Sequence, residues 1–215
     1  KILGITVDNK LTWNEHPNNV TSAINQRNGV LKRLSHHLPR KHLTQIANSI
    51  VTSKARYGLN VYGTVRLHED DQRNGHQSAI QVALNTTMRV VAGKKLSDRV
   101  PVRTLSEKTG IRSINQMCAE DRLMMAWKNV HEIGPPMDGV FQSECGHPSM
   151  SSRSKTLGKI QEKAKTTLGR RNLSHSAVVL WNNTDCMPLR TEKRKNPARN
   201  WFVRITRTSI LHVND

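Results

Sequence analysis

Three adjacent acids, Glu69-Asp70-Asp71, come nearest in this sequence to a catalytic pattern. Clustered carboxylates can hold two Mg²⁺ ions for phosphoryl or nucleotidyl transfer. These acids, however, stand in the polar phrase RLHEDDQRNG, with no apolar strand beside them, and precede an amphipathic segment. Acids at such a place favour the positive end of a helix dipole. We therefore interpret them as residues of a helix start, and we expect no catalytic residue, metal site or cofactor in this chain.

A second candidate is Cys145-Gly146-His147, which offers two ligands for zinc. A closed zinc site needs four ligands, and no partner pair stands at the spacing of a zinc finger. A nucleophilic Cys–His pair would need an orienting acid and an oxyanion hole, and the sequence places neither. We interpret this phrase as a loop.

The cysteines are three in number, far apart, and contain no CxxC pair. This usage is typical of a reducing compartment. No apolar run approaches the ~18 residues of a membrane span. The sequence therefore predicts an intracellular protein, nuclear or cytoplasmic or both, with no membrane partner.

The charge balance indicates the class of partner. The 215 residues include 34 Lys and Arg against 16 Asp and Glu, a formal net charge of +18. The positive excess is divided evenly between the two halves of the chain. It therefore does not come from a single basic tail. A field of this sign attracts polyanions, and we expect a nucleic-acid partner.

The spacing of apolar residues predicts a mainly α protein. We expect a short N-terminal β-hairpin or strand over 1–16, a helical bundle over 17–133, a loop or linker over 134–155 and a loop-rich basic helical region over 156–215. Only 4% of residues are aromatic. We expect the large ones in the helical segments to anchor the core rather than to stack on bases; they are Trp127, Trp181, Trp201 and Phe202.

Helix boundaries within the bundle follow from Pro and Gly. Pro17 fits a first helical turn, and an apolar stripe runs from Val20 to Leu34. The phrase His37-Leu38-Pro39 predicts a break, after which a second helix should return antiparallel to the first. Later helices are expected from about Asp70 to Val91 with Gly93 as C-cap, from Pro101 to Gly110, from Ile114 to Gly134, and around 177–181.

Six phrases, in one order, resemble the region that follows the polymerase core in non-LTR (LINE-type, jockey-like) retrotransposon reverse transcriptases. The opening LGITVDNKLTWNEH is similar to that family's LGVxLDxxLxWxxH, Leu34 to Arg40 to its LRRLxxxLPR, and RYGLNVYG to its DYGxxVWG. The segment 77–93 resembles LQxxQNxALRxxxG, 101–111 resembles TPxxxLxxxxGxxPL, and 169–188 resembles GKRSFSYRGxxLWNSLP. Departures include Arg56 where the family has Asp and Tyr62 where it has Trp.

The resemblance implies a thumb and C-terminal helical region that holds template and primer for a palm lying elsewhere in the polyprotein. The catalytic Asp motif of the family, with its Mg²⁺, is not found here, so the chain alone is expected to be inactive as an RNA-directed DNA polymerase. Two alternatives remain open at this point. One is an independent basic helical binding or interaction module derived from such an element, and the other is a decayed copy without function.

The expected partners are RNA, DNA or an RNA–DNA hybrid, together with the upstream palm and fingers. Basic side chains on helices neutralise phosphates without reading sequence. The residues predicted to do so are Lys32, Arg33, Arg40, Lys41, Arg153, Lys155, Arg170, Arg171, Lys193, Arg194, Lys195, Arg204 and Arg207.

Overall fold

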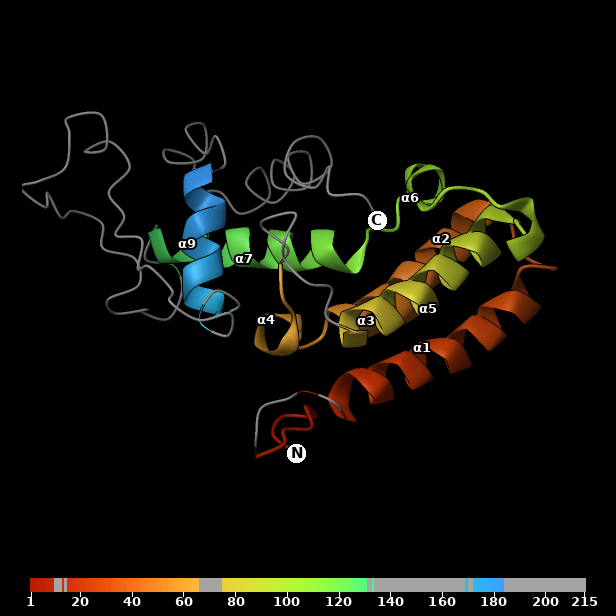
Figure 1. The fold of residues 1–215 in the computed structure, drawn as a ribbon. Coiled ribbons are helices and arrows are strands. Elements are labelled where there is room, and N and C mark those ends of the chain that lie inside the picture. Colours follow the sequence, from red (N-terminus) through yellow and green to blue (C-terminus); the bar gives the residue numbers. More distant parts are fainter. Residues whose placement is uncertain are drawn as a thin grey trace, which may run out of the picture. The chain divides into compact units, whose positions relative to one another are not determined.

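The computed structural model describes residues 1–9, 13, 15–65, 75–130, 133, 169 and 172–183 (Figure 1). These residues are mainly helical, as the sequence predicts, and fall into two compact units. Of the described residues, 1–9, 13, 15–63 and 75–117 belong to the first unit, and 64–65, 118–130, 133, 169 and 172–183 to the second. The loop expected over 134–155 lies outside the described residues, as do 156–168, 170–171 and 184–215 of the basic region and the acidic phrase at 69–71.

Three long helical segments build the first unit. Helix α1 spans Glu15–Leu34; α2 (Arg40–Ala47), a π-helical turn η1 (Asn48–Thr52) and α3 (Ser53–Arg56) follow one another directly; and α5 spans Gly75–Ala92. The chain reverses after α1, and α2 to α3 return along it, which confirms the expected antiparallel pair. The more extensive partner of α1 is nevertheless α5, which runs in the same direction as α1 (Figure 1).

The apolar stripe of α1 is buried as predicted, but one member of the stripe is polar. Asn28 is 5% exposed among Ile24, Leu31 and the residues of α5. Its Nδ2 donates to the carbonyl of Ala83 at 3.0 Å, and its Oδ1 accepts from the hydroxyl of Thr87 at 2.7 Å. Buried polar groups need such partners, so this pair of bonds fixes the register of α1 against α5.

Pro and Gly residues lie at helix ends in the first unit, as the sequence predicts. Helix α6 spans Val102–Thr109 between Pro101 and Gly110, and α7 spans Ile114–Val130, beginning in this unit and continuing into the second. Gly93 follows α5 with φ +64, and the Lys94 N–H donates to the Arg89 carbonyl at 2.9 Å. This is the C-cap expected from the sequence.

The prediction of an N-terminal strand or hairpin over 1–16 is wrong. Ile2 and Ile5 form a single antiparallel bridge around Leu3 and Gly4, which have φ of 47° and 80°. Two positive φ values in succession close a tight turn. No ladder extends from this bridge, and the part of the chain that the structure describes contains no strand.

In the second unit, α7 continues from Cys118 and is crossed by α9 (Leu173–Asn183) (Figure 1). Trp127 and Trp181 are each 1% exposed, which confirms that these two are core anchors. The buried Arg122 guanidinium donates from Nη1 to Ser176 Oγ, so α7 and α9 also share a polar contact. Among the described residues, no helix is long and apolar enough to span a membrane.

Candidate nucleic-acid interface

The α1–α2 joint carries the described part of the predicted basic set. Lys32 and Arg33 lie in the last turn of α1, and Arg40 and Lys41 in the first turn of α2; all four are exposed. The structure brings these four together at one end of the first unit. The other nine predicted residues fall outside the described part of the chain; they are Arg153, Lys155, Arg170, Arg171, Lys193, Arg194, Lys195, Arg204 and Arg207.

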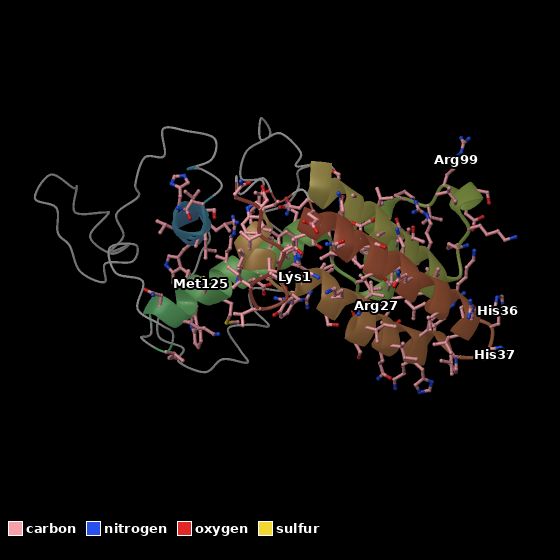
Figure 2. The ribbon with its side chains drawn as sticks, turned by 90° about the horizontal axis from the view of Figure 1, so that it is seen from below. Lys1, Arg27, His36, His37, Arg99 and Met125 are labelled. Atoms are coloured by element: carbon pink, nitrogen blue, oxygen red, sulfur yellow. The ribbon has the colours of Figure 1, made fainter. Side chains whose placement is uncertain are left out.

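Three further cations reach the same end, and the sequence pattern did not single them out. Because α5 runs in the direction of α1, its C-terminus lies beside the joint, with Arg40 Nη2 only 3.4 Å from where a Cβ on Gly93 would be. Lys94, Lys95 and Arg99 follow that glycine and are exposed. Figure 2 shows Arg99 at the same end of the unit as His36 and His37 of the joint.

We call this surface the cationic end. Its members are Lys32, Arg33, Arg40, Lys41, Lys94, Lys95 and Arg99. The Lys-Lys pair directly after the predicted C-cap Gly93 was a usable signal for the added lysines. The local sequence pattern does not encode the direction of α5 relative to α1, so it could not predict that these lysines lie beside the α1–α2 joint.

Helix stabilisation explains only part of this charge. Lys32 and Arg33 lie at the negative end of the α1 dipole, and the Arg40 guanidinium lies near the C-terminus of α5, so these positions favour a cation. Lys41 lies in the first turn of α2, where the dipole is positive, no acid is present and no side chain caps the helix. Like charge at that point costs roughly 0.3–1 kcal/mol. An anionic partner would offset this repulsion.

Carboxylates that would neutralise the surface are scarce. The sequence has no Asp or Glu between Glu15, the first residue of α1, and Glu69, a stretch that covers the rest of α1 and all of α2 to α4 (Leu59–Tyr62). Beside the lysines of the cationic end stands Asp98, whose Oδ2 accepts the Lys95 backbone N–H at 3.1 Å. The surface as a whole therefore retains a large positive excess.

The opening phrase LGITVDNKLTWNEH makes packing contacts through His16 that the sequence did not predict. His16 is 3% exposed; its Nδ1 accepts the Thr6 N–H at 3.3 Å, and its ring centroid lies 4.9 Å from that of Tyr62 in an edge-on contact. Burial, followed by the charge of Lys54, lowers the pKa of His16. The imidazole is thus held neutral as a packing element between the opening segment and α4.

Gly58, in the phrase Arg56 to Gly63, also has a structural role. Its φ is +69°, and a Cβ there would lie 2.7 Å from Ile5 Cδ1. Only glycine fits this close approach without a shift of its neighbour. Tyr57 next to it donates from its hydroxyl to the Leu3 carbonyl at 2.5 Å, so the opening segment is held against the α3–α4 corner.

Of the three cysteines, Cys118 lies in the described part of the chain. Cys118 is buried and free, and burial raises its pKa to about 11, with Arg122 opposing and Asp121 adding to the shift. It is therefore an unreactive core thiol. Cys145-Gly146-His147 and Glu69-Asp70-Asp71 lie outside the described residues, and the described part of the chain contains no cluster of potential metal ligands.

Comparisons with protein-family models, with curated proteins and with solved structures gave no match to this chain.

Proposed function

We propose that this chain is the C-terminal, thumb-type part of a non-LTR retrotransposon reverse transcriptase, and that it holds template-primer nucleic acid without an active site of its own. One observation carries the binding half of the proposal. Exposed cations from three separate segments, the end of α1, the start of α2 and the stretch after α5, meet at the cationic end with little carboxylate to neutralise them.

The family half of the proposal is supported by the ordered phrases of the sequence. Several of them coincide with structural features: the LPR phrase with the α1–α2 joint, the Tyr-Gly phrase with the corner at Gly58, and the 77–93 phrase with α5 and its cap. In a thumb these features would be positioned by the palm and fingers, which are the protein partners that the proposal implies.

Phosphate neutralisation predicts a specific binding behaviour. Lys and Arg side chains release counterions from the nucleic acid whatever its sequence, so affinity falls linearly with salt on logarithmic axes, with a slope of about −0.9 per phosphate contact on duplex DNA. We expect similar affinities for unrelated sequences of the same duplex type, because phosphate contacts carry no base information.

The test is a filter-binding titration of the full chain with labelled RNA–DNA hybrid, DNA duplex and single-stranded RNA of two unrelated sequences each. Saturable binding that weakens with salt and ignores sequence supports the proposal. Absence of binding at low salt, or affinity that does not change with salt, overturns it. A primer-extension assay run in parallel is expected to give no product; incorporation above background would contradict the absence of an active site.

A further inference from the structure

The same four-residue pattern occurs twice at the cationic end. Lys32-Arg33-Leu34-Ser35 closes α1, and Lys94-Lys95-Leu96-Ser97 follows α5. Each has basic residues three and two positions before a serine and a leucine directly before it. They are distant in sequence, yet the shared direction of α1 and α5 brings both to one end of the first unit (Figures 1 and 2).

The second copy is presented openly to solvent. Lys94 and Lys95 lie between α5 and the short 3₁₀ turn η2 (Leu96–Asp98), outside any helix, and both are exposed, as is Ser97. Leu96 is 76% exposed, although it is a large apolar side chain. Packing within the described part of the unit gives it no partner that would explain a leucine at this position.

The first copy is less accessible. Ser35 is half-buried, and its hydroxyl donates to the Lys32 carbonyl at 2.7 Å, while its N–H donates to the Leu31 carbonyl at 2.9 Å. Only the last turn of α1 needs to unwind to free it, and helix ends fray most readily.

Basic residues at these two positions before a serine are what a basophilic Ser/Thr protein kinase reads, because charge pattern determines kinase–substrate specificity. We propose that Ser97, and after it Ser35, are acceptors for such a kinase. The serine Oγ forms a bond to the γ-phosphorus of ATP, the bond from that phosphorus to the β-phosphate oxygen breaks, ADP leaves, and the hydroxyl proton passes to the catalytic base of the kinase.

The consequence follows from charge. Each phosphate adds about −1.5 to −2 units at neutral pH. At Ser97 it lies in sequence beside Lys94, Lys95 and Arg99, so it competes with a polyanion for the same cations. Phosphorylation therefore weakens nucleic-acid binding at the cationic end; this regulatory half rests on the proposed function, whereas the acceptor assignment does not.

Two residues serve as controls, because basic residues precede each of them in the sequence but each lies inside a helix. Ser106 has Arg103 three positions before it, yet it lies in α6 and its Oγ donates to the Ile111 carbonyl at 2.7 Å. Thr44 follows Arg40 and Lys41, yet it lies in α2 and its Oγ1 donates to the Arg40 carbonyl at 2.9 Å. Both are half-buried like Ser35, but they lie within a helix rather than beyond its end, so we expect both to stay unmodified.

The experiment incubates the full folded chain with the catalytic subunit of cyclic-AMP-dependent protein kinase, Mg²⁺ and ATP, and maps phosphate by mass spectrometry over time. We expect Ser97 first and Ser35 second, loss of most incorporation in Ser35→Ala/Ser97→Ala, and no change in Ser106→Ala. Phosphate on Ser106 or Thr44 as early as on Ser97, or none at Ser97 and Ser35 while a standard peptide is consumed, overturns the assignment.

The effect of phosphorylation on binding is tested by measuring the affinity of the mapped phosphoprotein for DNA duplex over a range of salt concentrations. The untreated chain is measured in parallel. We expect a lower affinity at every salt concentration, and the Ser35→Ala/Ser97→Ala protein carried through the same kinase reaction should bind like untreated protein. Equal affinities of modified and unmodified chains overturn the regulation. Failure of the unmodified chain to bind counts against the proposed function instead, and the acceptor assignment is then decided by the mapping alone.

Discussion

Asn28 of α1 accepts a hydrogen bond of 2.7 Å from the hydroxyl of Thr87 in α5, and it donates one of 3.0 Å to the Ala83 carbonyl. This buried polar contact lies within an otherwise aliphatic interface. It determines which turn of α1 faces which turn of α5, and the shared direction of these two helices is what places the residues after α5 beside the α1–α2 joint. Stability of this interface and assembly of the cationic end are thus linked.

Removing the Asn28 side chain should destabilise the first unit. Asn28→Ala leaves a cavity and removes both hydrogen bonds of the buried Asn28 amide, while the Thr87 hydroxyl keeps the Ala83 carbonyl as an acceptor at 3.1 Å. For this change we expect a loss of roughly 1–3 kcal/mol in the free energy of unfolding. Urea denaturation followed by circular dichroism measures it. Asn25→Ala, on the exposed face of α1, is the matched control and should change the midpoint little. Equal effects of the two substitutions would contradict the assigned role of Asn28.

His16 should make stability depend on pH. Its folded pKa is lowered by burial and by Lys54, so the unfolded chain binds the proton more readily. Stability is therefore complete above the unfolded value of about 6.5 and falls as pH drops from there towards the folded value. The comparison is the urea midpoint at pH 7.5 and pH 5.5 for wild type and for His16→Asn, whose side-chain oxygen can still accept the Thr6 N–H. An equal pH-dependent change in both proteins would rule out His16 as the source.

Cys118 should resist alkylation while the chain is folded. With a pKa of about 11, roughly one thiol in a thousand is ionised at pH 8, and the side chain has no exposure to solvent. The variant Cys145→Ser/Cys186→Ser leaves this thiol alone to react with iodoacetamide. Mass spectrometry should find little adduct in buffer and complete modification in guanidinium chloride. Rapid modification in buffer would show that α7 opens locally at this position.

The sequence predicted local features well and long-range features poorly, for physical reasons. Pro17 within the first turn of α1 and Gly93 after α5 act through their own backbone conformations, which the local pattern contains. The apolar run from Ile2 to Val7 is typical of a strand, but a strand needs a partner, and the positive φ values at Leu3 and Gly4 close a turn instead. The approach of Lys94 to the α1–α2 joint depends on packing between distant segments, which local patterns do not specify.

Removing charges from the cationic end should weaken nucleic-acid binding without destabilising the fold. Lys41→Gln, Lys94→Gln and Lys95→Gln remove exposed charges without burying a polar group, so the thermal midpoint should change little. The slope of log affinity against log salt on DNA duplex should become less negative by about 0.9 for each phosphate that the variant no longer neutralises. Arg103→Gln is the matched control, because it removes an exposed charge that Glu107 already pairs at 3.3 Å. We expect the triple variant to bind all sequences more weakly and to the same degree, and Arg103→Gln to bind as wild type does. If the triple variant bound unchanged, the polyanion would have to contact another part of the chain, and the cationic end would be no more than a solvated surface.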